Sequence, residues 1–377
     1  MKSNCAWGIA MVLSLAGILV TSAPTEGQAE QPLLHHTFED GMSGWMPMGT
    51  TAKLSITNDL AYIKESKHAL QFNYGINKGE INLAMTTIEP GTLALGRSLS
   101  YWVRTDFATT ILTALQEKDG GRYLSFSNCP KDRSQKIELN AKDFVLSQEP
   151  GDPVDPNGKL DMDQVTAIGI GDLGQLFIQI DKPEINQFFN IQPGNHVMYI
   201  DDLLVSRTAF AETALPAGQI WLDSLVHPQV SWIAIGNPNV SAVQPDLKGP
   251  HMLQLVYHLS KGKPMGIMKN VPREHLKDIK QVTFKVATDK ATTLFVQLET
   301  RDGNKFNAPL SLDAGLDKPR DITLKYGDFT VGQDSKDPNA SLDMSKVKTM
   351  MLVDISSMQE DKTVDNTLRV WDLKAAK

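Results

Sequence analysis

The residues best suited to bind a small polar molecule are one aromatic ring and several polar side chains on predicted strands. Apolar and polar residues alternate along these strands, so Trp102 and Arg104 point away from the core. The same alternation turns Gln71, Asn73 and Gln116 outward. An aromatic face packs against the C–H side of a sugar ring, while amide and guanidinium groups bond its hydroxyls. The spacing therefore predicts a carbohydrate-binding surface.

The same residues also have a structural interpretation. A tryptophan at an outward strand position can lie beneath a loop, as part of a second small core, and its amide neighbours can simply be hydrated. Residue types and spacing do not distinguish the two, so both interpretations stay open here.

Composition and motifs exclude several other classes of function. The 377-residue chain has 37 Lys and Arg against 44 Asp and Glu, a net charge of −7, and lacks the basic excess typical of nucleic-acid binding. Its two cysteines can form neither a disulfide framework nor a cysteine zinc site. The sequence contains no G-x-S-x-G, no H-E-x-x-H and no glycine-rich phosphate loop. We therefore expect no enzyme, although carboxylates for glycoside hydrolysis are abundant.

Internal repetition indicates that the chain contains one domain twice. Three segments recur at a spacing of 183 residues and a fourth at 182: 68–74 with 251–257, 105–110 with 288–293, 119–120 with 302–303, and 155–162 with 337–344. A repeat this long is a domain duplication rather than a solenoid. We call 30–207 copy one and 219–377 copy two, joined by a small-residue linker at 208–218. We expect each copy to fold separately, with few contacts to the other.

Each copy is predicted to consist of short β-strands. Period-two alternation runs through 99–104 and 197–202 in copy one, and through 281–286 and 293–298 in copy two. Asp-Gly pairs between such stretches indicate hairpins. Short strands in copies of roughly 170 residues predict an all-β protein of two tandem β-sandwich domains.

Several short motifs resemble a known family. The sequence resembles jelly-roll modules with the galactose-binding-like fold at Phe-Glu-Asp-Gly (38–41), Gly-x-x-Gly-Trp (41–45), 67–72, Asp-Phe (143–144), Asp-Pro (155–156) and Tyr-Ile-Asp-Asp (199–202). It is most similar to the family-eleven carbohydrate-binding modules and the related complex-I intermediate-associated domain. Copy two keeps the later motifs but lacks the opening Phe-Glu-Asp-Gly.

This resemblance implies two alternative functions and a metal. The carbohydrate-binding modules imply a polysaccharide or oligosaccharide ligand, whereas the complex-I-associated relatives imply a protein partner in envelope assembly. The fold also implies a structural Ca²⁺ in copy one, held by Glu39, Glu65 and Asp201, with Asp40 or Asp202 as substitutes. The alternative is that these are turn, surface and strand-edge acids.

Copy two is expected to lack the calcium site, and whether it binds a ligand stays open. Lys285 stands where copy one has its outward tryptophan. Val226 and Lys248 align with two of the three implied calcium ligands; a valine cannot ligate, and a lysine repels a cation. The third implied ligand aligns with Asp372.

A second acidic segment, 152–163, is rich in oxygen ligands but lacks the spacing of an EF-hand. Its better interpretation is a turn at 156–158, with Asp161 capping a short helical turn and Asp343 doing the same in copy two.

The first 29 residues predict a signal peptide. Lys2 precedes an apolar stretch at 6–20, which is short for a membrane span; an uncleaved anchor is the alternative. No other stretch is long enough to cross a bilayer, so we expect no transmembrane anchor and a periplasmic or extracellular location. Cys129 would then be either a buried thiol or part of an intermolecular disulfide.

Overall fold

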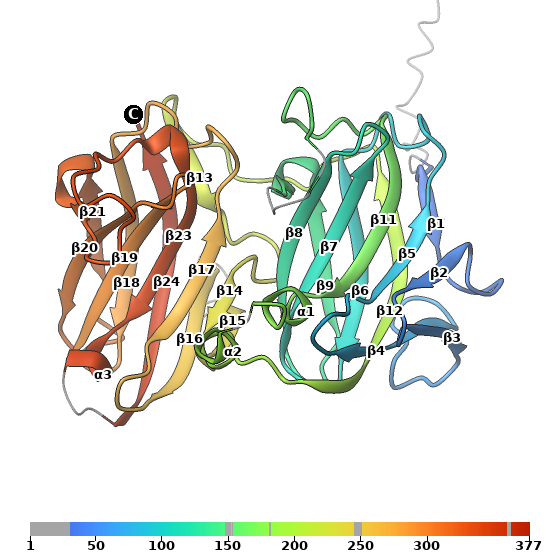
Figure 1. Cartoon of the computed structure of the whole chain (residues 1–377), viewed down its shortest axis with the longest axis horizontal. Helices are drawn as coiled ribbons and strands as arrows, with labels where there is room; N and C mark the ends of the chain where they lie inside the picture. Colours follow the sequence, from blue (N-terminus) through green and yellow to red (C-terminus); the bar gives the residue numbers. More distant parts are fainter. Residues whose placement is uncertain (1–30, 148–151, 153, 181, 245–250, 360–362) are drawn as a thin grey trace, which may run out of the picture. The chain divides into compact units, whose positions relative to one another are not determined.

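The computed structural model describes residues 31–147, 152, 154–180, 182–244, 251–359 and 363–377. The predicted signal peptide at 1–29 lies outside these residues. Nearly all of the described elements are β-strands (Figure 1), and every strand pairing between them is antiparallel. None of the helices in the described ranges is long and apolar enough to cross a membrane.

Copy one contains two sheets. The order in sheet A is β3 (Lys53–Thr57), β4 (Ala69–Ile76), β12 (Gly194–Ser206), β6 (Ser98–Thr105) and β9 (Gln135–Asn140), with β1 (Leu34–His36) on β12. The order in sheet B is β10 (Val145–Leu146), β8 (Arg122–Cys129), β7 (Thr109–Glu117), β11 (Val165–Asp172), β5 (Leu83–Thr87) and β2 (Trp45–Met48).

Copy two repeats this arrangement. The order in sheet C is β15 (Asn239–Val243), β16 (Met252–Leu259), β24 (Val364–Ala376), β18 (Gln281–Thr288) and β21 (Arg320–Lys325), with β13 (Gln219–Asp223) on β24. The order in sheet D is β22 (Thr330–Val331), β20 (Lys305–Leu312), β19 (Thr292–Thr300), β23 (Val347–Asp354), β17 (Met265–Asn270) and β14 (Ile233–Ile235).

Helices are short. They are α1 (Gly174–Phe177), α2 (Pro183–Phe188) and α3 (Ser356–Gln359), with 3₁₀ turns η1 (Ala141–Asp143), η2 (Tyr326–Asp328) and η3 (Met344–Lys346). Because the strand orders of sheets A and C match, and those of B and D match, the duplication is present in the topology. The predicted all-β fold of two tandem sandwiches is confirmed.

Two separate cores lie between the paired sheets. In copy one, Phe72 and Tyr101 of sheet A pack with Ile168 of sheet B in one buried cluster, while copy two forms its own cluster around Trp232. Alternating side chains of β4 and β6 are buried, as period-two spacing requires. Cys129 belongs to the first core, so the buried interpretation of this thiol is confirmed, and burial raises its pKa to about 11.

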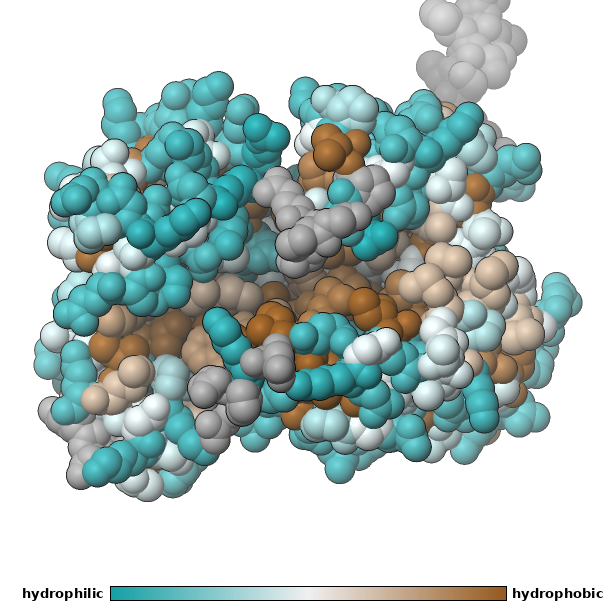
Figure 2. Space-filling view, viewed as in Figure 1, coloured by the Kyte–Doolittle hydropathy of each residue, from teal (hydrophilic) through white to brown (hydrophobic). Residues whose placement is uncertain are grey.

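A third apolar cluster contains residues of both copies. Leu173 of copy one packs with Ile235 and Met268 of copy two, and Phe177 lies against them. Backbone bonds add to this contact, with the Asn128 N–H donating to the Val230 carbonyl at 2.8 Å. Figure 2 shows apolar side chains gathered over the region that Figure 1 labels α1, β8 and β17. The two copies therefore share this apolar cluster in addition to their own cores, and their separate folding stays a prediction.

Candidate functional site

Four of the five predicted sugar-binding residues lie together on the outer face of sheet A. Gln71 and Asn73 are on β4, Trp102 and Arg104 are on β6, and β12 lies between the two strands. All four side chains are half-buried, whereas the residues beside them in the chain are buried in the core. The predicted alternation is confirmed, and the role of these residues in binding stays a prediction.

Gln116 does not belong to this surface. It is on β7 in sheet B, the other sheet of the sandwich. Its Nε2 donates to the carbonyls of Gly120 at 2.8 Å and Gly121 at 3.1 Å, so the amide closes the β7–β8 hairpin. The alternation of apolar and polar residues correctly predicted that this side chain points away from the core. It does not indicate to which of the two sheets the strand belongs.

Tyr199 completes the surface, although sequence reasoning did not select it. On β12 it pairs with Gln71 on one side and with Arg104 on the other. An amide, a phenol ring and a guanidinium group therefore stand side by side in one row across three strands. Tyr199 is at an outward position of the alternating stretch 197–202, and that signal could have identified it.

The loop between β3 and β4, residues 58–68, packs onto this row; we call it the face loop. The Tyr62 ring stacks on Tyr199, with centroids 3.7 Å apart and planes inclined by 3°. The Arg104 guanidinium lies 5.3 Å from the centroid of the Tyr62 ring, and its Nη1 donates to the Ala61 carbonyl at 3.1 Å. Burial raises the pKa of Tyr199 to about 12. The face loop therefore contributes an aromatic ring that the strand pattern could not reveal.

Trp102 combines features of both interpretations. Its side chain is half-buried, and its cross-strand neighbour on β12 is Asp201. The indole Nε1 is buried and has no hydrogen-bond partner among the described residues. A buried N–H without a partner is unfavourable by roughly 1–3 kcal/mol, so this donor lacks the partner that a buried N–H normally has.

Asp201, the central ligand of the implied calcium site, already has protein partners. Its carboxylate accepts from the backbone N–H groups of Lys64 at 2.7 Å and Glu65 at 3.1 Å, and from the Ser66 hydroxyl. These donors direct positive hydrogens at the oxygens that a cation would need. Glu65 thus approaches Asp201 through its backbone, not through its carboxylate.

The other implied ligands are also engaged elsewhere. Glu39 accepts from the Lys67 N–H at 2.5 Å, which lowers the pKa of its carboxyl, and contacts His68 at 3.2 Å. Asp202 contacts the His35 ring at 2.7 Å. The carboxylates named by the resemblance do not fit a Ca²⁺ in this arrangement, and bound calcium remains a prediction from the resemblance alone.

Copy two departs further from that site than the sequence alignment predicted. Asp202 and Asp372 are the residues with positive φ, 52° and 59°, in the corresponding strands β12 and β24. The counterpart of Asp372 is therefore Asp202, and Asp201 corresponds to Trp371, one residue earlier. Asp201 therefore has no acidic counterpart in copy two, and Lys248, which the sequence aligns with Glu65, lies outside the described residues.

One acidic triplet within the described ranges is compact enough to share a cation. The carboxylate oxygens of Glu117, Asp119 and Asp155 lie within 4.8 Å of one another. Glu117 accepts from the Asp161 N–H at 2.5 Å, and the Tyr123 hydroxyl donates to Asp155. Burial raises the pKa of Glu117 to about 7. Sequence reasoning singled out Asp155 but missed Glu117, which lies on a strand far from it in the chain.

The acidic segment is chiefly structural, as its preferred interpretation stated. Asp343 caps η3 by accepting from the Ser345 N–H at 3.0 Å, which confirms that prediction. In copy one, Asp161 instead accepts from the Asn157 side chain at 2.6 Å, so the predicted cap is not formed there. Copy two has Lys346 3.7 Å from Asp302, which adds a positive charge beside the equivalent acids.

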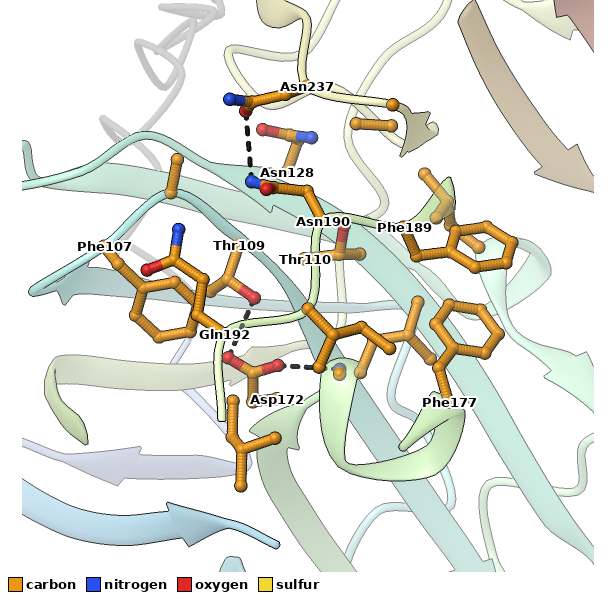
Figure 3. Close-up of a pocket in the computed structure, with 18 of the residues that line it drawn as sticks. Phe107, Thr109, Thr110, Asn128, Asp172, Phe177, Phe189, Asn190, Gln192 and Asn237 are labelled. Carbon is orange, nitrogen blue, oxygen red and sulfur yellow. Dashed lines mark hydrogen bonds between the residues drawn. The ribbon is translucent and has the colours of Figure 1, made fainter. Parts of the chain in front are cut away.

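A pocket with a cavity volume of about 50 Å³ is lined by residues of both copies (Figure 3). Asp172 lies on its wall and accepts from Tyr74 at 3.0 Å, Thr109 at 2.8 Å and the Gly174 N–H at 2.7 Å. Burial raises the pKa of Asp172 to about 6. Because copy two repeats the tyrosine–aspartate pair at Asp354, this pair is a shared structural element.

Comparisons with known proteins place carbohydrate-binding modules among the similar solved structures. One is a family 11 module of a cellulosomal cellulase from Clostridium thermocellum, 13% identical, covering 43% of this chain and 96% of its own, with a TM-score of 0.34. Another is a tandem of two family 22 modules from Paenibacillus barcinonensis, 13% identical, covering 94% of this chain and 99% of its own, with a TM-score of 0.31. No protein-family model and no curated protein matches the chain.

Proposed function

We propose that copy one binds a saccharide on the outer face of sheet A. The observation that carries this proposal is the row formed by Gln71, Tyr199 and Arg104, with Trp102 on the next outward position of β6. A surface that combines rings, here Tyr62 stacked on Tyr199, with planar forked hydrogen-bonding groups suits a sugar, whose ring faces are apolar and whose edges carry hydroxyls.

The chemistry of the row favours a neutral ligand. Gln71 and Asn73 can each donate and accept, and their amides lie 3.4 Å apart. Arg104 donates to the Ala61 carbonyl and lies against the Tyr62 ring, which fixes the direction of its remaining donors. The proposed role is binding without catalysis, in a protein exported by its N-terminal segment.

A paired substitution tests the site. We expect Gln71→Ala combined with Arg104→Ala to weaken binding of the full chain to neutral glycans on an array at least tenfold, since each lost hydrogen bond contributes about 1 kcal/mol. Gln254→Ala, the same residue type at the equivalent position of β16, is the matched control and should bind as wild type. Equal binding by all three proteins would remove sheet A from the proposed function.

A protein partner is the second candidate function, as the complex-I-associated resemblance implies. The observation in its favour is the edge strand β2, where Met46 is 43% and Met48 is 38% exposed. Edge strands with exposed apolar side chains are suited to protein contacts. Two results together would favour this candidate. The wild-type chain would bind no glycan on the array, and it would bind a protein that the Met46→Lys variant no longer binds.

A further inference from the structure

A groove lined by both copies lies apart from the outer face of sheet A. Its inner hollow is the pocket of Figure 3, with a volume of about 50 Å³, and a neighbouring outer hollow has about 560 Å³. The two hollows share Ala108, Asn128, Asn237 and Pro238 in their walls, so they adjoin, and we call the pair the groove.

Part of the groove wall is a segment that only copy one has. Twenty-one residues separate Asp172 from Gly194 in copy one, whereas nine separate Asp354 from Val364 in copy two. The longer connection contains α2 and the wall residues Phe189 to Gln192. The duplication alone therefore does not account for the groove.

Several of the polar groups in the groove are side-chain amides. Asn128 lies near the end of β8, Asn190 follows α2 and Asn237 follows β14, and these three converge in Figure 3. Asn190 Nδ2 donates to Asn237 Oδ1 at 3.0 Å. The side-chain amides of Asn128 and Gln192 bond to no described residue. The groove thus presents unused donors and acceptors from separate segments of the chain.

The charged groups of the groove are largely satisfied within the protein. Asp172 accepts from a tyrosine, a threonine and a backbone N–H. In the outer hollow, His258 and Asp365 pair with each other at 2.8 Å, and Lys131 lies 3.9 Å from Asp132. A ligand that matches these walls is neutral and has groups that both donate and accept, as hydroxyls do.

Aromatic rings supply the apolar part of the wall. Phe177 and Phe189 stack with centroids 3.9 Å apart, and Phe107 lies near the Thr109–Asp172 bond in Figure 3. Rings beside unpaired amides are the combination that receives the C–H faces and hydroxyls of a sugar.

From this chemistry and these sizes, we propose that the groove binds the end of a neutral oligosaccharide. The inner hollow has room for little more than the volume of one or two water molecules, so it takes only terminal hydroxyl groups. The outer hollow accommodates the sugar units that follow. This site uses different residues from sheet A and does not rest on the function proposed there.

The two sites therefore differ in what they accept. The flat face of sheet A can contact internal units of a long polymer, whereas the groove requires a chain end. Short neutral oligosaccharides have more chain ends per sugar unit than a polymer has, so they should bind in the groove. A polymer of the same sugar should compete only weakly with them for this site.

The test titrates the full chain with a panel of short neutral oligosaccharides and with their parent polysaccharides. Asn128→Ala combined with Asn237→Ala should weaken oligosaccharide binding about tenfold and leave polymer binding unchanged. Asn339→Ala, an exposed asparagine in a copy-two turn, is the control and should bind as wild type. Thermal unfolding of each variant checks that the fold is kept.

The outcomes separate this site from the one on sheet A. If the Gln71→Ala/Arg104→Ala variant loses all binding while Asn128→Ala/Asn237→Ala binds oligosaccharides as wild type, the groove proposal is overturned and the proposed function stands. If only the groove variant loses binding, the groove is supported and the sheet A site is wrong. If no oligosaccharide binds wild type, the groove proposal fails.

Discussion

Glu117 is a residue whose charge should affect the stability of copy one. Burial raises the pKa of its carboxyl to about 7, from an ordinary value of 4.5, because the ionised form is poorly solvated. Its favourable contribution is complete below the unfolded pKa and is lost as pH rises through the folded pKa. We expect Glu117→Gln to be more stable than wild type at about pH 8, by about 1–3 kcal/mol, and equally stable at about pH 4.

Denaturant unfolding of both proteins across this pH range measures the difference. Glutamine keeps an oxygen for the Asp161 N–H, so the substitution changes charge more than packing. Glu89→Gln, on an exposed residue, should follow wild type at every pH. A gap between wild type and Glu117→Gln that stays constant with pH would show that the carboxyl ionises normally.

Asp201 offers the sharpest test of the calcium prediction. Its carboxylate accepts two backbone N–H groups and a hydroxyl, so Asp201→Asn would direct an amide N–H₂ at these donors. We expect a loss of about 1–3 kcal/mol in the free energy of unfolding, equal in Ca²⁺ and in EDTA. Melting curves decide the matter: a Ca²⁺-dependent rise of the wild-type midpoint, absent in Asp201→Asn, would instead establish the calcium site.

Single residues also show which features could be predicted from the sequence and which could not. Gln71 and Trp102 could be predicted as outward-facing because their strands alternate with period two. The outward direction of Gln116 could also be predicted. Its place in sheet B could not, because it depends on which distant strands pair, and a local pattern of residues does not show this. Tyr62 lies in a loop without periodicity, so its stacking on Tyr199 could not be predicted at all.

At the level of elements, the face loop is held by a ring stack and by hydrogen bonds to Asp201. Tyr62→Ala removes the contact with Tyr199 and should destabilise copy one by about 0.5–1.5 kcal/mol. Because the loop loses its anchor, backbone amides at 61–66 should exchange with solvent faster. Tyr62→Phe keeps the ring and serves as the control. Unchanged exchange in Tyr62→Ala would mean that Asp201 and the buried Ile63 hold the loop without the stack.

The strand order illustrates what a repeat can and cannot reveal. Recurring segments at a fixed spacing predicted that β4 and β16, or β6 and β18, occupy equivalent places, and the matching sheet orders confirm this. The spacing changes after β11 because copy one has the longer connection to β12. The sequence alignment therefore matched Asp201 with Asp372, although its counterpart is Trp371. β12 and β24 each contain a β-bulge, and nothing in the sequence marks which residue forms it.

For the whole molecule, the shared apolar cluster affects the expected stability and self-association of each copy when it is expressed alone. Separate chains of residues 30–207 and 219–377 keep their own cores, so each should unfold cooperatively. Each also exposes part of the cluster around Leu173 and Ile235, so its midpoint should lie below that of the intact chain, and it should tend to self-associate. Circular dichroism melts and gel filtration measure both effects. A fragment without a cooperative transition would contradict the boundary or the separate cores.

The central claim is that copy one binds a saccharide on the outer face of sheet A, and nuclear magnetic resonance of the ¹⁵N-labelled chain tests it most directly. The Trp102 indole N–H, assigned by its loss in Trp102→Phe, should shift when a glycan selected on the array is added, because that donor is unpaired in the free protein. The side-chain amide of Gln71 should shift at the same glycan concentration. A glycan that binds while both signals stay fixed would contradict the claim.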